Sequence, residues 1–330
     1  MPTTLRAIGP DDAADVRLLD DLASLLAGRH QRHRLTSPLL DPDWERPERA
    51  RAVLAEQLGD PCASGAVAYD GDRAVAYLLA KVSDNSTWGA SAWIESAGVA
   101  AAGLDGDAET VRDLYALAAQ GWVDSGHPVH YTLVPAGDAA LVDAFFRLGF
   151  GLQHVHAARV PAVTPAPPSG VTVRRARRED VPVLPRLDRE LPLHQGRAPV
   201  FSSGHLPTEE EALQEWEEGF DDERFATFVA EVDGEVVGSA VGCALEVSSS
   251  HAGPARLDHA GFLGFAAVLP QARGHGAGRA LGEAVIGWSH DQGHRSVVTD
   301  WRATNLLSSR TWPKLGFEPT FLRLHRVVGY

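Results

Sequence analysis

The residues best suited to chemistry in this chain form a glycine-rich loop, Arg273-Gly274-His275-Gly276-Ala277-Gly278, between a predicted strand and a predicted helix. Glycine lets the backbone turn tightly, and the first turn of a helix leaves several N–H groups without partners in the helix. These amides and the positive end of the helix dipole attract anions. The loop therefore predicts a phosphate-binding site, to which Arg273 and Arg279 add positive charge.

Other kinds of glycine-rich loop fit this segment poorly. A dinucleotide-binding loop requires G-x-G-x-x-G at the first strand-to-helix turn of a parallel sheet, and a Walker loop requires G-K-[ST] after its glycines. The segment reads R-G-x-G-x-G, follows strands predicted to be antiparallel, and contains no lysine. A tight turn that binds nothing remains the structural alternative.

The elements that must position this loop are predicted from hydrophobic pattern and turn residues. Thr208, followed by three glutamates, is the expected N-cap of one helix. The order predicts an α/β (α+β) fold with a mixed, largely antiparallel central sheet flanked by helices. The expected strands cover 171–174, 225–232, 236–247, 260–269, 296–301 and 317–328, and the expected helices begin near 179, 208, 276 and 306.

The chain repeats this pattern. Thr172-Val173-Arg174 echoes Thr4-Leu5-Arg6 at an offset of 168 residues, and Leu315-Gly316-Phe317 echoes Leu148-Gly149-Phe150 at 167. A segment with four prolines over 160–170 separates the copies and predicts a stiff linker at the surface. We therefore expect two tandem domains of one fold, over 1–160 and 171–330, joined by a Pro-rich linker over 161–170.

The loop and the residues after it resemble the GNAT superfamily of N-acetyltransferases, in which R-x-x-G-x-G binds the pyrophosphate of coenzyme A. Asn305, with Trp312 and Leu315-Gly316-Phe317 after it, is similar to the family's N-x-x-A-x-x-x-Y-x-x-x-G-F ending. The resemblance implies two tandem GNAT-like domains. It also implies that the C-terminal domain transfers acetyl from acetyl-coenzyme A to a primary amine by direct attack, without a metal.

The same resemblance assigns cofactor contacts to positions of this chain. The strand before the loop would bind the pantetheine arm, the loop would bind the pyrophosphate, and a later turn would bind the pantetheine again. Through backbone or side chain, the implied cofactor-binding residues are Ala266, Ala267, Val268, Arg273, Gly274, His275, Gly276, Ala277, Gly278, Arg279, Asn305 and Ser308.

The chain departs from the family at the catalytic positions. Trp312 stands where many members have a tyrosine, and indole cannot act as a general acid. Phe262 and Gly264 stand where some members carry a base. His194 and His205 could line an acceptor site or be exposed loop residues. The candidate bases are residues expected near strand ends, namely Glu246, Asp258, His259 and Asp300.

The first copy is predicted to have lost the phosphate site. Aligning the repeats places Asp107 opposite Gly276, with Asp105 and Glu109 beside it, and carboxylates there would repel a pyrophosphate. The first domain is therefore expected to be a degenerate GNAT-like domain. Its basic run, residues 29–34, is interpreted as a solvated helix end, with an anion site as the alternative.

The composition of the chain limits the classes of partner that we expect. With 30 basic and 44 acidic residues the net charge is −14, which argues against nucleic acid. Cys62 and Cys243 stand far apart, which suggests a reducing, cytoplasmic setting, and no apolar run suggests a membrane span. We expect a small-molecule amine, peptide N-terminus or lysine as acceptor, and a monomer or homodimer. The alternatives are an acetyltransferase similar to mycothiol synthase and a non-catalytic acyl-coenzyme A sensor or binding module.

Overall fold

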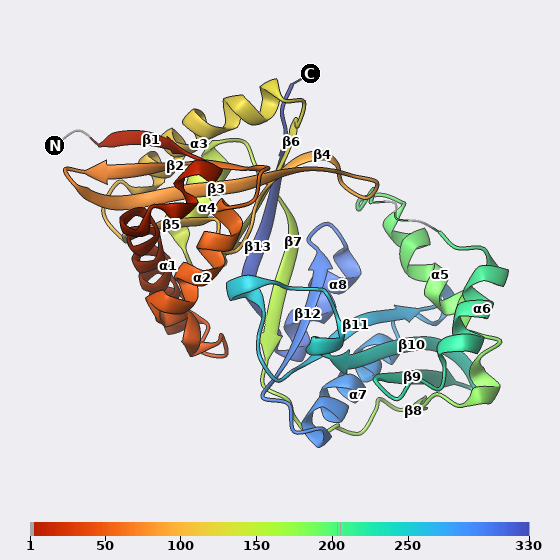
Figure 1. Cartoon of the computed structure of the whole chain (residues 1–330). Coiled ribbons are helices and arrows are strands. Elements are labelled where there is room, and N and C mark those ends of the chain that lie inside the picture. Colours follow the sequence, from red (N-terminus) through yellow and green to blue (C-terminus); the bar gives the residue numbers. More distant parts are fainter. Residues whose placement is uncertain (1–2, 203, 205, 330) are drawn as a thin grey trace. The chain divides into compact units, whose positions relative to one another are not determined.

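The structure, a computed structural model, describes residues 3–202, 204 and 206–329 and divides into two compact units (Figure 1). Unit 1 comprises residues 1–155, 251–256 and 319–330, and unit 2 comprises residues 156–250 and 257–318. The two-domain expectation thus has a structural counterpart, although neither unit is continuous in sequence.

Unit 1 has a twisted sheet with helices on both faces. Alternation along β3 sends Leu78 into the core under α3 and α4, and Leu79 into the core under α1 and α2. The strand order is β1-β2-β3-β4-β6-β13, and β5 also pairs with β3. The elements are β1 (Thr4–Ile8), α1 (Val16–Thr36), α2 (Pro47–Leu58), β2 (Ala63–Asp70), β3 (Arg73–Asn85), β4 (Gly89–Ile94), β5 (Val99–Ala101), α3 (Asp107–Asp124), β6 (Val129–Pro135), α4 (Ala139–Arg147) and β13 (Glu318–Val327). Strand β7 (Gly151–Arg159) begins in unit 1 and ends in unit 2.

The last strand of the chain belongs to unit 1, whereas the predicted boundaries placed it in the C-terminal domain. β13 pairs antiparallel with β6, from Phe321 opposite Pro135 to Val327 opposite Val129. Leu324 is fully buried in the unit 1 core. The burial of this apolar side chain explains why β13 completes this sheet.

Unit 2 follows the predicted order of elements closely. Thr208 caps α6 as expected, and its hydroxyl accepts a hydrogen bond of 3.1 Å from the Glu211 amide. The sheet order is β12-β11-β10-β9-β8. The elements are β8 (Val171–Arg175), α5 (Leu184–Gln195), α6 (Glu209–Gly219), β9 (Phe225–Val232), β10 (Glu235–Ala244), β11 (Ala260–Val268), α7 (Ala277–Asp291), β12 (Ser296–Arg302) and α8 (Leu306–Thr311).

Strand β11 changes its pairing along its length. It runs parallel to β12 over Ala260–Leu263, while its antiparallel ladder with β10 continues to Val268. The ladder with β10 skips Gly264, which marks a β-bulge. From Gly264 onward, the edge of β11 that faces away from β10 has no ladder partner in the described chain.

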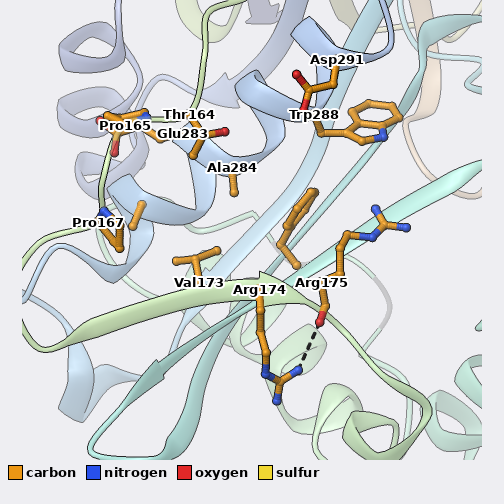
Figure 2. A pocket seen from close by; sticks show the side chains of 12 residues that line it. Thr164, Pro165, Pro167, Val173, Arg174, Arg175, Glu283, Ala284, Trp288 and Asp291 are labelled. Atoms are coloured by element: carbon orange, nitrogen blue, oxygen red, sulfur yellow. Dashed lines mark hydrogen bonds between the residues drawn. The ribbon is translucent and has the colours of Figure 1, made fainter.

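The proline-rich segment lies against α7 in unit 2 (Figure 2). Thr164, Pro165 and Pro167 line a cavity of about 290 Å³ together with Glu283 and Trp288 of α7. A Cβ on Gly287 would stand 1.6 Å from the Thr164 hydroxyl oxygen, so this helix needs glycine where the segment crosses it.

Among the described residues, none of the helices has both the length and the apolar character that a membrane span requires.

Candidate active site

A cavity of about 470 Å³, here called the loop cavity, adjoins the glycine-rich loop of unit 2. Among the residues expected to bind a cofactor, His275 does not line this cavity, and its side chain is exposed. The other expected residues all line it, namely Ala266, Ala267, Val268, Arg273, Gly274, Gly276, Ala277, Gly278, Arg279, Asn305 and Ser308.

The loop has the backbone conformation that an anion site needs. Gly274 and Gly276 both have φ of +88°, a left-handed value that residues with a Cβ rarely adopt. Gly276 is the N-cap of α7 and provides no capping side chain, so the first-turn amides of the helix face the cavity without a side-chain cap.

The strand before the loop offers backbone groups to the same cavity. The Leu269 amide donates to the Val237 carbonyl of β10 at 2.8 Å. Because alternate residues of a strand point to opposite edges, the amides of Ala266 and Val268 point away from β10. The Val268 carbonyl accepts a hydrogen bond of 3.1 Å from Arg273 Nε. The exposed edge of β11 can therefore receive an extended polar chain, as another strand would.

The lining of the loop cavity is strongly cationic. Glu190 is the one carboxylate among its described lining residues, and it lies 3.7 Å from Arg273. Arg279 pairs with Glu283 at 2.8 Å. The cationic lining residues are Arg273, Arg279, Arg310 and Lys314.

A second cavity of about 890 Å³, here called the aromatic cavity, adjoins the first. The two share Leu191 and meet along β11, where Phe265 lines the aromatic cavity and Ala266 the loop cavity. Asp188 and Glu215 line the aromatic cavity, and no lysine or arginine is among its described lining residues. Its aromatic walls come from Trp216, Phe220, Phe225, Phe262 and Phe265.

Helix α5 serves both cavities from one face. Asp188 lines the aromatic cavity, Leu191 lines both, and His194 lines the loop cavity. These residues are three positions apart and so lie on one side of a helix. Burial raises the pKa of the Asp188 carboxyl to about 6, against the opposing effect of a hydrogen bond from Trp216 Nε1. A carboxyl with that pKa can accept a proton near neutral pH.

The structure does not bring the four candidate bases to these cavities. Asp258 and His259 are exposed just before β11 begins, at the end of the strand opposite the loop. Glu246 is also exposed and accepts a hydrogen bond from the His259 amide at 3.1 Å. Asp300 follows Thr299, the last residue of β12 paired with β11, but lines neither cavity. Their positions near strand ends were expected, but none of the four lines either cavity.

His194 and Trp312 are two further side chains of the loop cavity. His194 Nε2 lies 3.2 Å from Asn305 Oδ1, which also caps α8 through the Leu307 amide. Trp312 lines the loop cavity as a buried side chain. His205 lies outside the described residues. Asp188 was not among the residues predicted from the sequence, because nothing in the linear sequence indicates that α5 packs along β11. The three-residue spacing of Asp188, Leu191 and His194 was the one signal that the sequence offered.

In unit 1 a side chain fills the counterpart of the glycine-rich loop. The residue matching Gly276 is Gly106, because each is a left-handed helix N-cap, so the sequence alignment with Asp107 was wrong by one position. Asp107 therefore corresponds to Ala277. The Asp107 carboxylate accepts hydrogen bonds from the amides of Gly103 at 2.7 Å and Leu104 at 3.0 Å. The carboxylate thus occupies the place of an anion.

The strand edge of unit 1 is filled as well. Arg29 donates to the carbonyls of Val99 and, at 2.7 Å, Ser96, while Arg32 donates to the Ala101 carbonyl at 2.5 Å. The expectation of a solvated helix end was wrong for Arg29, which is 1% exposed. Arg29 can be buried because its guanidinium group donates to the carbonyls of Val99 and Ser96, whereas Arg32 in the same run is exposed.

Comparisons with known proteins show which family the chain belongs to. Residues 191–317 match the model of the Acetyltransferase (GNAT) family. Over 118 residues the chain is 32% identical to aminoglycoside N(6')-acetyltransferase type 1 of Stenotrophomonas maltophilia, covering 36% of this chain and 75% of the relative.

Solved structures extend the likeness to the whole chain. A GCN5-related N-acetyltransferase from Sphaerobacter thermophilus matches with a TM-score of 0.57 and 18% identity, over 98% of this chain and 95% of that one. A GCN5-related glucosamine N-acetyltransferase region of a fungal multi-domain β-N-acetylglucosaminidase matches with a TM-score of 0.52 and 14% identity, over 98% of this chain and 38% of that one. The chain belongs to the GNAT family and is an acetyltransferase.

Proposed function

We propose that unit 2 transfers the acetyl group of acetyl-coenzyme A to a primary amine bound in the aromatic cavity. The observation that carries this proposal is the contrast between two cavities that meet along β11. The loop cavity is cationic and offers helix and strand amides, as a pyrophosphate and a pantetheine arm require. The aromatic cavity is acidic, as a basic amine requires.

The backbone conformation of the glycine-rich loop in unit 2 suits the pyrophosphate of coenzyme A. Gly274 and Gly276 hold the loop in a left-handed conformation that directs amides to one point, and Gly278 follows in the first turn of α7. Acetyl-coenzyme A supplies an activated thioester when bound. The Val268 amide, on the open edge of β11, would polarise the carbonyl as negative charge develops there.

Proton transfers are assigned to α5. Asp188 would accept a proton from the attacking amine as the nitrogen–carbon bond forms, and His194 would donate a proton to the departing sulfur as the carbon–sulfur bond breaks. Asp188 replaces the four earlier candidate bases because it lines the aromatic cavity. Many family members have a tyrosine as proton donor at the position of Trp312. We assign that role to His194 here, because His194 lines the loop cavity. No acyl-enzyme is required, since burial raises the pKa of Cys243, the cysteine in the aromatic cavity.

The acceptor is expected to combine a protonatable amine with an apolar body. The curated relative is named for the acetylation of aminoglycosides, which are amines, and this supports the class of acceptor. The five aromatic side chains of the cavity favour an acceptor less polar than a bare sugar.

The test is turnover with acetyl-coenzyme A and a panel of aliphatic, aromatic, sugar and peptide amines, read as release of free thiol. Calorimetry with coenzyme A measures cofactor binding separately. Thiol release that depends on an amine supports the proposal. Tight coenzyme A binding without amine-dependent release contradicts it and favours the binding module.

A further inference from the structure

Unit 1 contains a cavity of about 740 Å³ that no step of acetyl transfer uses, here called the tryptophan cavity. All its lining residues belong to unit 1, including Ala252 and Gly253 from the segment 251–256. It is built from α2, β3 and β4, as the aromatic cavity of unit 2 is built from α6, β10 and β11. Unit 1 thus keeps a cavity on the acceptor side although its cofactor groove is filled by Arg29, Arg32 and Asp107.

Two indoles form a rigid wall of this cavity. The Trp88 and Trp93 rings meet edge to face with centroids 5.3 Å apart, and Tyr131 stacks on Trp93 at 4.1 Å. Trp93 Nε1 donates to Ser91 Oγ at 3.1 Å, which fixes the ring further. Ordered aromatic surfaces of this kind bind flat or apolar groups, and organic cations, with little loss of side-chain entropy.

A carboxyl stands beside this wall. Glu95 follows β4 directly and lines the cavity, and the residue is exposed. Among the described residues, none forms a hydrogen bond or an ion pair with the Glu95 carboxyl. The surrounding protein raises its pKa by desolvation, while the charge of Arg323 opposes that shift.

The two cationic side chains of the cavity, Lys81 and Arg323, have partners other than Glu95. Lys81 forms an ion pair with Asp60. Arg323 lies over Trp88 at 4.9 Å and donates to Gln153 Oε1 at 2.8 Å. Glu56 adds a further carboxylate to the lining, so that acidic side chains outnumber basic ones. This balance favours a cation over an anion.

We propose that the tryptophan cavity is a second ligand site, which binds a small primary ammonium compound with its charged group against Glu95 and its apolar or aromatic body against Trp88 and Trp93. The site binds this amine without acetylating it, because the adjoining cofactor groove is occupied by the protein's own side chains. This binding does not depend on acetyl transfer in unit 2.

The test is calorimetric titration of the full chain with 2-phenylethylamine, and with 3-phenylpropionate as an anion of similar shape. The Asp188→Asn variant serves as the background, so that the aromatic cavity of unit 2 has lost one of its two lining carboxylates. We expect the amine to bind and the anion to bind at least tenfold more weakly. This comparison requires no change in unit 1.

Glu95→Gln in the same background tests the site itself. Loss of a charged hydrogen bond should weaken amine binding by tenfold or more, whereas Glu48→Gln, an exposed carboxylate on α2, should leave it unchanged. In the otherwise native chain, Glu95→Gln should retain amine-dependent thiol release, which separates this site from the proposed function. The proposal is overturned if 2-phenylethylamine does not bind, if the anion binds equally well, or if folded Glu95→Gln binds the amine as its parent does.

Discussion

The Asp107 carboxylate accepts a hydrogen bond of 2.7 Å from the backbone amide of Gly103, across the turn that leads into α3. The same side chain accepts a second bond from Leu104. In unit 2 the residue at this place is Ala277, which has no group to give to the corresponding amides. The difference between a filled and an open anion site is thus located at one side chain.

Ala277→Asp should therefore close the anion site of unit 2. The new carboxylate would bond the amides of Arg273 and Gly274 and repel a pyrophosphate, and we expect coenzyme A affinity to fall at least about tenfold, since bonds to charged groups contribute about 1.5–3 kcal/mol. The helix should remain stable because an acidic residue suits its first turn. Calorimetry with coenzyme A checks this, with Gln271→Asp, which adds the same charge outside the loop cavity, as control. Equal affinity in Ala277→Asp and the native chain would contradict the assignment.

Arg29→Met should destabilise unit 1. The guanidinium of Arg29 is buried and satisfies the carbonyls of Ser96 and Val99, which methionine would leave without partners. Unsatisfied buried groups cost about 1–3 kcal/mol each, so we expect a loss of about 2–4 kcal/mol. Urea unfolding measures this, and Arg17→Met, on an exposed position of the same helix, should change stability little. A loss as small as that of Arg17→Met would show that these bonds are unimportant.

These two sites show what the sequence could and could not reveal. The sequence was enough to predict that the glycines, Asn305 and the strand before the loop lie together, because motif spacing and local backbone preferences determine their placement around one cavity. The alignment of Asp107 failed because the repeat offset changes within the loop, and only backbone conformation identifies Gly106 as the counterpart of Gly276. The buried role of Arg29 and the approach of Asp188 to the acceptor side depend on helix packing over long sequence separations, which local pattern does not encode.

Asp188→Asn should change both activity and its pH dependence. The carboxyl acts as a base only when ionised, and burial raises its pKa to about 6, so activity of the native chain should rise with pH through about 6. The variant should lose this limb and about 10²–10⁴-fold in kcat/KM with the amine acceptor. Steady-state rates from pH 5 to 8 check this. An unchanged acidic limb in the variant would exclude Asp188 as the base.

The stability of Asp188→Asn should move in the opposite direction from its activity. A carboxyl whose pKa is raised on folding favours the protonated form, so the stability of the native state falls as pH rises from about 4 to about 6 and stays lower above that. The amide cannot ionise, and the variant should be more stable than the native chain at pH 7, by up to about 2 kcal/mol. Chemical denaturation at pH 5 and 7 measures this. A large loss of stability would mean that the carboxylate is required for folding.

His30 and His33 should make unit 1 sensitive to acid. Burial lowers the pKa of His30 to about 4 and that of His33 to about 3, with the nearby Arg29 charge adding to both shifts. The unfolded state binds protons from about pH 6.5 downward, whereas the folded state does not, so stability should fall steadily as pH drops from 6.5 to 4. His33→Gln should reduce this slope and the exposed His275→Gln should not. Melting temperatures measured from pH 6.5 to 4 test this prediction. An equal dependence of melting temperature on pH in the native chain and both variants would contradict the role of His33.

Gly276→Ala and Gly274→Ala form a matched pair that tests how the proline-rich segment supports the loop. Both glycines have φ of +88°, so an alanine at either position carries the same left-handed strain, about 1–2 kcal/mol. A Cβ at Gly276 would also stand 2.8 Å from Pro168 Cγ, whereas a Cβ at Gly274 would meet nothing within 4 Å. Overpacking costs about 1–3 kcal/mol more, so Gly276→Ala should unfold at lower urea concentration than Gly274→Ala. Coincident unfolding curves would show that Pro168 yields without cost, and that the segment does not hold the loop.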